Sequence, residues 1–128
     1  MKDEERQVLI KHNRMKAQEA IEQVKWLIEN KQFFLAVNRI YYGVYYMLSA
    51  IALKEHFKTS KHLQLIGWFN KTYVKTGLID RKYGRWINQA YENRMEGDYN
   101  VLADFTEEKV KQAFEEMKDM IAKLEKLL

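Results

Sequence analysis

The chain contains no cysteine and no proline among its 128 residues. Without cysteine it cannot form disulfides, thiolate metal sites or a cysteine nucleophile. This excludes zinc fingers and secreted disulfide scaffolds, and it fits a reducing cytoplasm. The five glycines stand apart from one another, so none of them belongs to a glycine-rich phosphate loop.

Long apolar runs are also missing. The longest apolar stretch, residues 40–53, falls short of the roughly 20 residues that a bilayer span needs. The charged start of the sequence leads into no apolar segment, so we expect neither a signal peptide nor a membrane anchor. We therefore predict a cytoplasmic protein. Its net charge of +4 is mild and permits contact with nucleic acid without requiring it.

The hydrophobic spacing is helical throughout, and no window alternates as a strand would. Asp80 and Thr106 are expected to cap two helices, Thr59 and Ser60 another, and Gly77 to end one, with Leu78 folding back. The expected helices span residues 3–29, 32–57, 61–76, 81–97 and 107–128. Because the connections are short, we predict an all-α, antiparallel, four- to five-helix up-and-down bundle that forms a single domain over residues 1–128.

Two different faces are predicted for the second helix. One face is apolar and comprises Val37, Ile40, Val44, Met47, Leu48 and Ile51. The other carries amide, guanidinium, phenol and hydroxyl groups, from Asn38, Arg39, Tyr42, Tyr45, Tyr46 and Ser49. A solvent-facing side would carry lysine and glutamate instead, so we expect other helices to cover both faces, the second one in a semi-buried polar setting.

A buried arginine on this polar face needs an anionic partner. The fourth helix offers Arg94 and Asp98, which are four residues apart and therefore share one side. The predicted ligand-binding site comprises Asn38, Arg39, Tyr42, Arg94, Asp98 and Tyr99. Two guanidinium groups facing one carboxylate leave cationic donors free, which is typical of a phosphate site. The alternative is a salt-bridged network that only fixes the helix register.

Three short motifs occur in order along the chain. They read Ala36-x-Asn38-Arg39-x-Tyr41-Tyr42-x-x-Tyr45-Tyr46, Ser60-Lys61-His62 and Arg94-x-x-x-Asp98-Tyr99. Together they resemble the HEPN domain, and more specifically its small stand-alone prokaryotic members, over residues 21–121. The resemblance implies a helical bundle that forms a homodimer. It also implies a minimal nucleotidyltransferase as partner, in a toxin–antitoxin or defence pair.

Many members of the family that this chain resembles are metal-independent ribonucleases, with a catalytic histidine four to six residues after an arginine. Arg94 matches that arginine, but no histidine follows His62 in the sequence. His62 is therefore the candidate replacement if the fold carries it to Arg94; otherwise it is a packing or capping residue. The resemblance also makes Tyr99 a candidate for nucleotide attachment by the partner.

The histidines show no metal-ligand spacing, and we expect no metal ion and no cofactor. Three functions stay open on the sequence alone. The leading one is a binding module that engages a nucleotidyltransferase and a nucleotide or RNA phosphate. The second is a metal-independent ribonuclease with a degenerate Arg94/Asp98 site. The third is a structural adaptor between proteins.

Overall fold

The helical spacing of the sequence produces five α-helices and no strand. The computed structural model describes residues 1–128, and the bundle is all-helical as predicted. A short π-helix, η1 (Asn70–Val74), continues the third helix. The α-helices are α1 (Asp3–Glu29), α2 (Phe33–Lys54), α3 (His62–Phe69), α4 (Arg81–Tyr99) and α5 (Glu107–Glu125).

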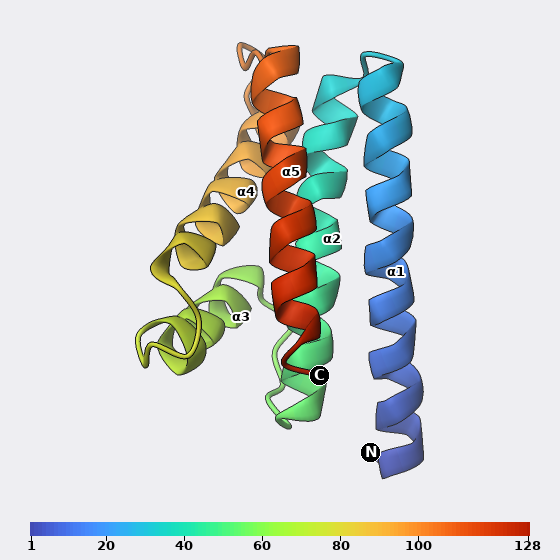
Figure 1. Ribbon diagram of the computed structural model, residues 1–128, viewed down its shortest axis with the longest axis vertical. Coiled ribbons are helices and arrows are strands. Elements are labelled where there is room, and N and C mark those ends of the chain that lie inside the picture. The colour runs from blue at the N-terminus through green and yellow to red at the C-terminus, as the bar shows by residue number, and fades with distance from the viewer.

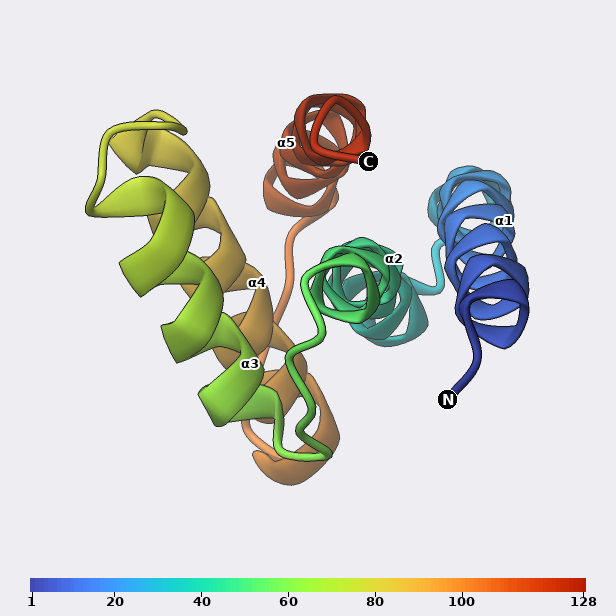
Figure 2. The same cartoon turned by 90° about the horizontal axis from the view of Figure 1, so that it is seen from below.

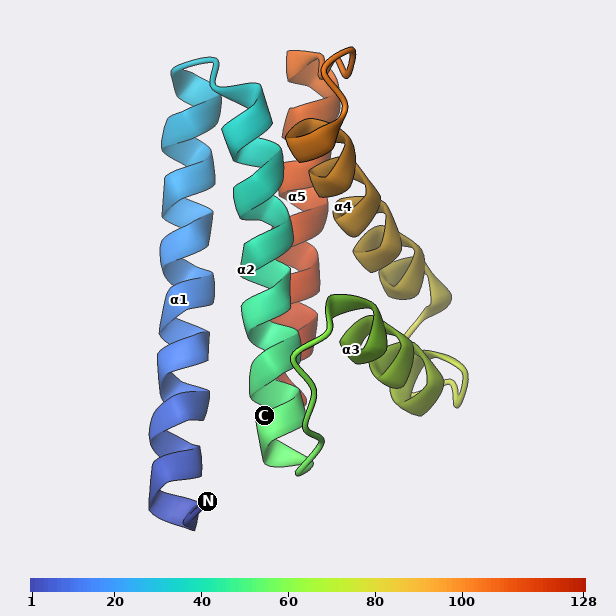
Figure 3. The ribbon, with the colours of Figure 1, turned by 180° about the vertical axis from the view of Figure 1, so that it is seen from behind.

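Helix α2 lies at the centre of the molecule, and the other helices surround it (Figure 2). Helices α1, α2 and α5 run nearly alongside one another, with α1 antiparallel to α2 and α5 parallel to α2 (Figure 1). The short α3 and the tilted α4 cover the remaining side of α2 (Figure 3). Both chain ends lie at the same end of the bundle, and no helix is both long and apolar enough to cross a bilayer.

The apolar face of α2 packs where α1 and α5 approach it most closely. All six residues predicted for that face are buried. A Cβ atom at Gly43 would overlap Met117 Cε of α5 and lie 3.1 Å from Ala20 Cβ of α1. Small residues on α1 therefore face α2, whereas Val8 and Met15, which have the spacing of a core stripe, are exposed.

Helix boundaries follow the local capping signals with some corrections. Asp80 and Thr106 accept hydrogen bonds from Lys82 N and Lys109 N, as predicted. Helix α3 has no side-chain cap, because Thr59 Oγ1 instead accepts from Lys61 N in the preceding turn. The prediction for Leu78 is wrong, since Leu78 is exposed and the buried residue after Gly77 is Ile79.

Candidate functional site

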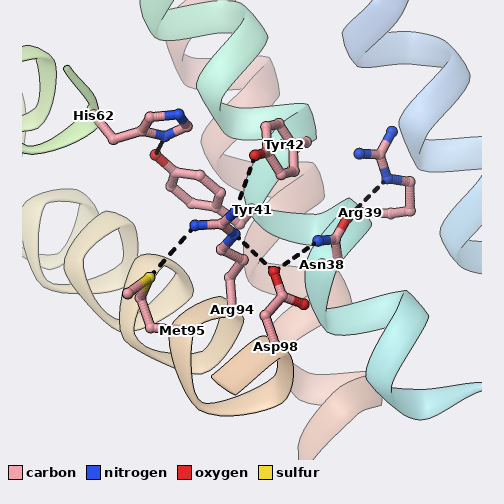
Figure 4. A network of polar contacts seen from close by, with 8 residues as sticks. All are labelled: Asn38, Arg39, Tyr41, Tyr42, His62, Arg94, Met95 and Asp98. Carbon is pink, nitrogen blue, oxygen red and sulfur yellow. Dashed lines mark hydrogen bonds and ion pairs between the residues drawn. The ribbon is translucent and has the colours of Figure 1, made fainter.

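The second face of α2 is semi-buried, as the sequence predicts. Its six polar and aromatic residues are all intermediate in exposure, with Asn38, Arg39 and Tyr42 at the end where α4 crosses. Helix α4 brings Arg94 and Asp98 against this end, and α3 brings His62 (Figure 4). We call Asn38, Arg39, Tyr42, Arg94 and Asp98 the Tyr42 cluster.

Tyr42 lies between the two arginines of the cluster. The guanidinium carbon of Arg39 is 5.0 Å from the centre of the Tyr42 ring, and that of Arg94 is 5.5 Å from it. Arg94 Nη2 also donates to Tyr42 Oη at 3.2 Å. Both guanidinium groups therefore contact one electron-rich ring, which attracts cations without neutralising them.

Asp98 is the one carboxylate that joins the cluster. Its Oδ2 atom lies 3.0 Å from Arg94 Nε, and the two side chains are 30% and 16% exposed. Arg94 Nε nevertheless lacks hydrogen-bond geometry to any acceptor, so this contact is an ion pair alone. Asn38 Nδ2 donates to the same carboxylate at 3.3 Å, while Arg39 Nε donates to Asn38 Oδ1 at 3.2 Å. Arg39 thus reaches the carboxylate only through an amide.

Arg39 turns away from Arg94 toward α1 (Figure 4). There it lines a groove of about 390 Å³ between α1 and α2, together with Asn38 and the side chains of Gln23, Trp26, Leu27 and Leu35. The two arginines therefore do not converge on Asp98 as the sequence suggested. Arg94 pairs with it directly, and Arg39 faces an open groove on the other side of Tyr42.

Tyr99 stands at the edge of the site. It is the last residue of α4, its side chain is 69% exposed, and its ring centre lies 5.8 Å from the Arg94 guanidinium carbon. The fold thus brings five of the six predicted ligand-binding residues into one connected cluster, with Tyr99 exposed beside it.

His62 begins α3 and packs on the tyrosines of α2. Its ring stacks on Tyr45 with centroids 4.3 Å apart and meets Tyr42 edge-on at 5.9 Å. The fold therefore brings His62 to the same ring that both arginines contact. Burial, followed by the positive charge of Arg94, lowers the pKa of His62 and favours the neutral imidazole.

Tyr41 is the site residue that sequence reasoning missed. It is fully buried, and its Oη lies 2.6 Å from His62 Nδ1. Burial, with the neighbouring phenols, raises its pKa far above the usual value, so the phenol keeps its proton. With both groups neutral, we assign Tyr41 as donor to Nδ1, which leaves the proton of His62 on Nε2. On the helical wheel Tyr41 falls between the two faces, so its spacing alone gave little signal.

The side chains of this arrangement are predominantly cationic. Three or more histidine or carboxylate groups gather nowhere in a metal-binding arrangement. The Tyr42 cluster holds two guanidinium groups against one carboxylate, with a neutral imidazole beside them. Such a set can hold an anion.

Comparison with known proteins places the chain in a family. Residues 11–127 match the family described as the HEPN domain. A Thermotoga maritima protein named "UPF0332 protein" is 36% identical over 97% of this chain and 94% of its own length. Two Methanocaldococcus jannaschii proteins are also similar. "Putative toxin MJ0605" is 32% identical over 88% of this chain and 83% of its own length. "Putative toxin MJ0142" is 30% identical over 73% of this chain and 63% of its own length. These matches and the helical fold establish that the chain belongs to the HEPN domain family.

Proposed function

We propose that this chain is the HEPN component of a toxin–antitoxin or defence pair, and that its Tyr42 cluster binds a phosphate of a nucleotide or RNA. One observation carries the proposal of phosphate binding. Arg39 and Arg94 both contact the Tyr42 ring, and Asp98, which pairs with Arg94, is the one carboxylate of the cluster. A phosphate beside Tyr42 would accept bonds from the guanidinium group on that side and supply the missing negative charge.

The proposal of a partner protein and a homodimer rests on similarity to related proteins. Two relatives carry the name "Putative toxin", and a toxin of such a pair needs an antitoxin. The motif resemblance favours a nucleotidyltransferase as that partner and a homodimer as the form of this chain. Co-expression with the neighbouring gene product, followed by co-purification and light scattering, tests both. A monomer that the partner fails to retain would contradict this half.

Titration of the purified protein with labelled RNA and with ATP tests the phosphate half. We expect binding that weakens between about 50 mM and about 200 mM salt, because each phosphate contact releases counterions. Arg94→Gln should weaken binding by about tenfold or more, since hydrogen bonds to charged groups contribute about 1.5–3 kcal/mol.

Arg85→Gln is the matched control, because it removes the same charge from an exposed position on α4. It should leave the affinity within about twofold, as a distant surface charge has little effect under salt screening. Absence of binding at low salt, or an equal loss in Arg85→Gln and Arg94→Gln, would contradict the phosphate site.

A second function, a metal-independent ribonuclease, is favoured by the position of His62 beside Tyr42 and in the field of Arg94. A base role uses the other neutral tautomer, in which Nδ1–H donates to Tyr41 Oη and the lone pair of Nε2 is free to accept a proton. The expected activity is RNA cleavage that survives EDTA and is lost in both Arg94→Ala and His62→Ala. Cleavage that is unchanged in His62→Ala would exclude His62 as the replacement for the missing downstream histidine.

A further inference from the structure

Arg6 of α1 is the one charged residue that the fold buries, with 8% of its surface exposed. Its guanidinium makes a single hydrogen bond, from Nη1 to Leu53 O at 3.0 Å, and its buried Nε has no partner. It takes part in none of the ion pairs of the molecule. The fold thus buries most of this charged side chain and pairs it with no carboxylate.

The end of α2 accounts for only part of this arrangement. Leu53 belongs to the last turn of α2, where the helix dipole places a partial negative charge, and its carbonyl also accepts from His56 N. That carbonyl satisfies one donor of Arg6 and leaves the rest of the guanidinium unpaired. Buried charges in proteins are normally paired, so the empty protein lacks a counter-charge at this position.

A groove opens beside Arg6. It has a volume of about 620 Å³ and lies between α1, the second half of α2 and the connection to α3. These segments adjoin at the end of the bundle where α1 begins (Figure 3). Its lining includes Lys58 and contains no aspartate or glutamate. The charged side chains that line the groove are therefore both cationic.

Several hydrogen-bond donors in the groove are free. Ser49, Ser60 and Tyr46 line it, and none of their hydroxyl groups bonds to another protein group. Thr59 lines it too, but its hydroxyl is already engaged with Lys61 N and Gln64 Oε1. A guanidinium, an ammonium and free hydroxyls around one hollow match the acceptor oxygens of a phosphate.

We propose that this groove, defined by Arg6, Tyr46, Ser49, Lys58 and Ser60, is a second phosphate-binding site. Arg6 supplies the buried charge, Lys58 a mobile charge at the rim, and the hydroxyls complete the shell. The phosphate is carried by a nucleotide or by single-stranded nucleic acid. None of these residues belongs to the Tyr42 cluster, so phosphate binding at the two sites can be tested independently.

The position of the groove relates it to the Tyr42 cluster. Tyr46 and Ser49 follow Tyr42 by four and seven residues, which places them on the same side of α2. Seven residues of helix span about 10 Å, a distance that a few nucleotides of a single strand can cover. One strand could therefore place phosphates in both sites, with tyrosine rings between them.

Titration of the full chain with inorganic phosphate, followed by the backbone amide NMR signals, tests the site directly. At constant ionic strength we expect saturable shifts at Ser49, Lys58 and Ser60 that chloride does not produce. Arg6→Gln should weaken this binding by about tenfold or more and Lys58→Gln by several-fold, as a charged contact is lost in each. Arg85→Gln, the matched surface control, should leave it unchanged.

The outcomes separate this site from the Tyr42 cluster. Arg94→Gln should leave the shifts at the groove in place even if it abolishes binding at Tyr42. Lys58 is exposed, so Lys58→Gln folds whether or not Arg6→Gln does. Absence of phosphate-specific shifts in the unmodified protein overturns the proposal, and so do shifts that survive intact in Lys58→Gln and in folded Arg6→Gln.

Competition then identifies the source of the phosphate. If the site takes free nucleotides, ATP displaces inorganic phosphate and a short RNA does so no better. If it takes a strand, the RNA displaces phosphate at lower concentration. In that case Arg6→Gln and Arg94→Gln each reduce the salt slope of RNA binding by about 0.7. Failure of both ATP and RNA to displace phosphate contradicts a nucleotide or nucleic-acid ligand.

Discussion

The two faces of α2 differ in burial and in chemistry. The face toward α1 and α5 is apolar and buried, and Gly43 allows close contact with Ala20 and Met117. The face toward α3 and α4 is only half-buried and carries tyrosines and an arginine. One helix thus provides both the core of the fold and a charged surface that packing alone does not require.

The polar contacts of the second face support this distinction. The hydrogen bonds that join Arg39, Asn38, Asp98, Arg94, Tyr42 and Met95 are 3.2–3.4 Å long. A buried network that fixes helix register is stable only when its charges are paired and its donors satisfied. Here Arg94 Nε has no hydrogen-bond acceptor and the carboxylate is 30% exposed. We therefore expect changes on this face to alter binding more than folding.

The largest loss of stability is expected on the apolar face. Met117 of α5 is completely buried against Gly43, so Met117→Ala leaves a cavity between α2 and α5. Such changes cost about 2–5 kcal/mol of unfolding free energy, which urea denaturation measures. The affinity of the folded variant for RNA should stay unchanged. A matching loss of affinity would mean that the two faces are not independent.

A smaller loss is expected at Tyr41, which lies where the two faces meet. Tyr41→Phe keeps the buried ring and removes only the hydrogen bond to His62 Nδ1. The expected cost is about 0.5–1.5 kcal/mol in the same denaturation experiment. A loss as large as that of Met117→Ala would show that the polar face also stabilises the fold strongly.

The polar face of α2, unlike the apolar one, should make stability depend on pH through His62. Burial and the charge of Arg94 lower the pKa of His62, so the unfolded chain takes up a proton at a higher pH than the folded protein. This contribution to stability is therefore complete above the unfolded pKa of about 6.5 and is lost as the pH falls below it.

His62→Asn places an amide oxygen near the position of Nδ1 and cannot titrate in this range. It should flatten the fall in stability between neutral and mildly acidic pH, measured by denaturation at several pH values. His12→Asn, on the exposed side of α1, is the control and should keep the fall. An unchanged pH profile in His62→Asn would show that His62 is not the titrating group.

The sequence predicted the helices and both faces of α2 well because local signals determine them. The extent of α1 and the caps Asp80 and Thr106 follow from spacing and from side chains that bond to the first turn. In α1, Val24 and Ile28 are buried, but Val8 and Met15 are exposed although they have core spacing, and small side chains such as Ala20 make the close contact with α2. The prediction that Leu78 folds back was wrong because Ile79 N donates to Tyr73 O, and this hydrogen bond turns Ile79 inward in place of Leu78.

The sequence predicted which residues form the candidate site better than it predicted how they are arranged. Spacing placed Arg94 and Asp98 on one side of a helix, and the structure pairs them. The separation of Arg39 from Asp98 by Asn38 depends on how α2 and α4 cross, which no sequence pattern specifies. The burial of Tyr41 and Arg6 likewise depends on segments distant in the chain, α3 for one and the end of α2 for the other.

Arg94→Gln provides the most direct test of the central claim that the Tyr42 cluster serves ligand binding and not helix register. Its RNA affinity and its free energy of unfolding should be measured on the same preparation. We predict an affinity loss of about tenfold or more with a stability change within about 1 kcal/mol, as for a partly solvated ion pair. Unchanged affinity together with a stability loss of about 3–5 kcal/mol, as for a broken buried pair, would contradict the claim.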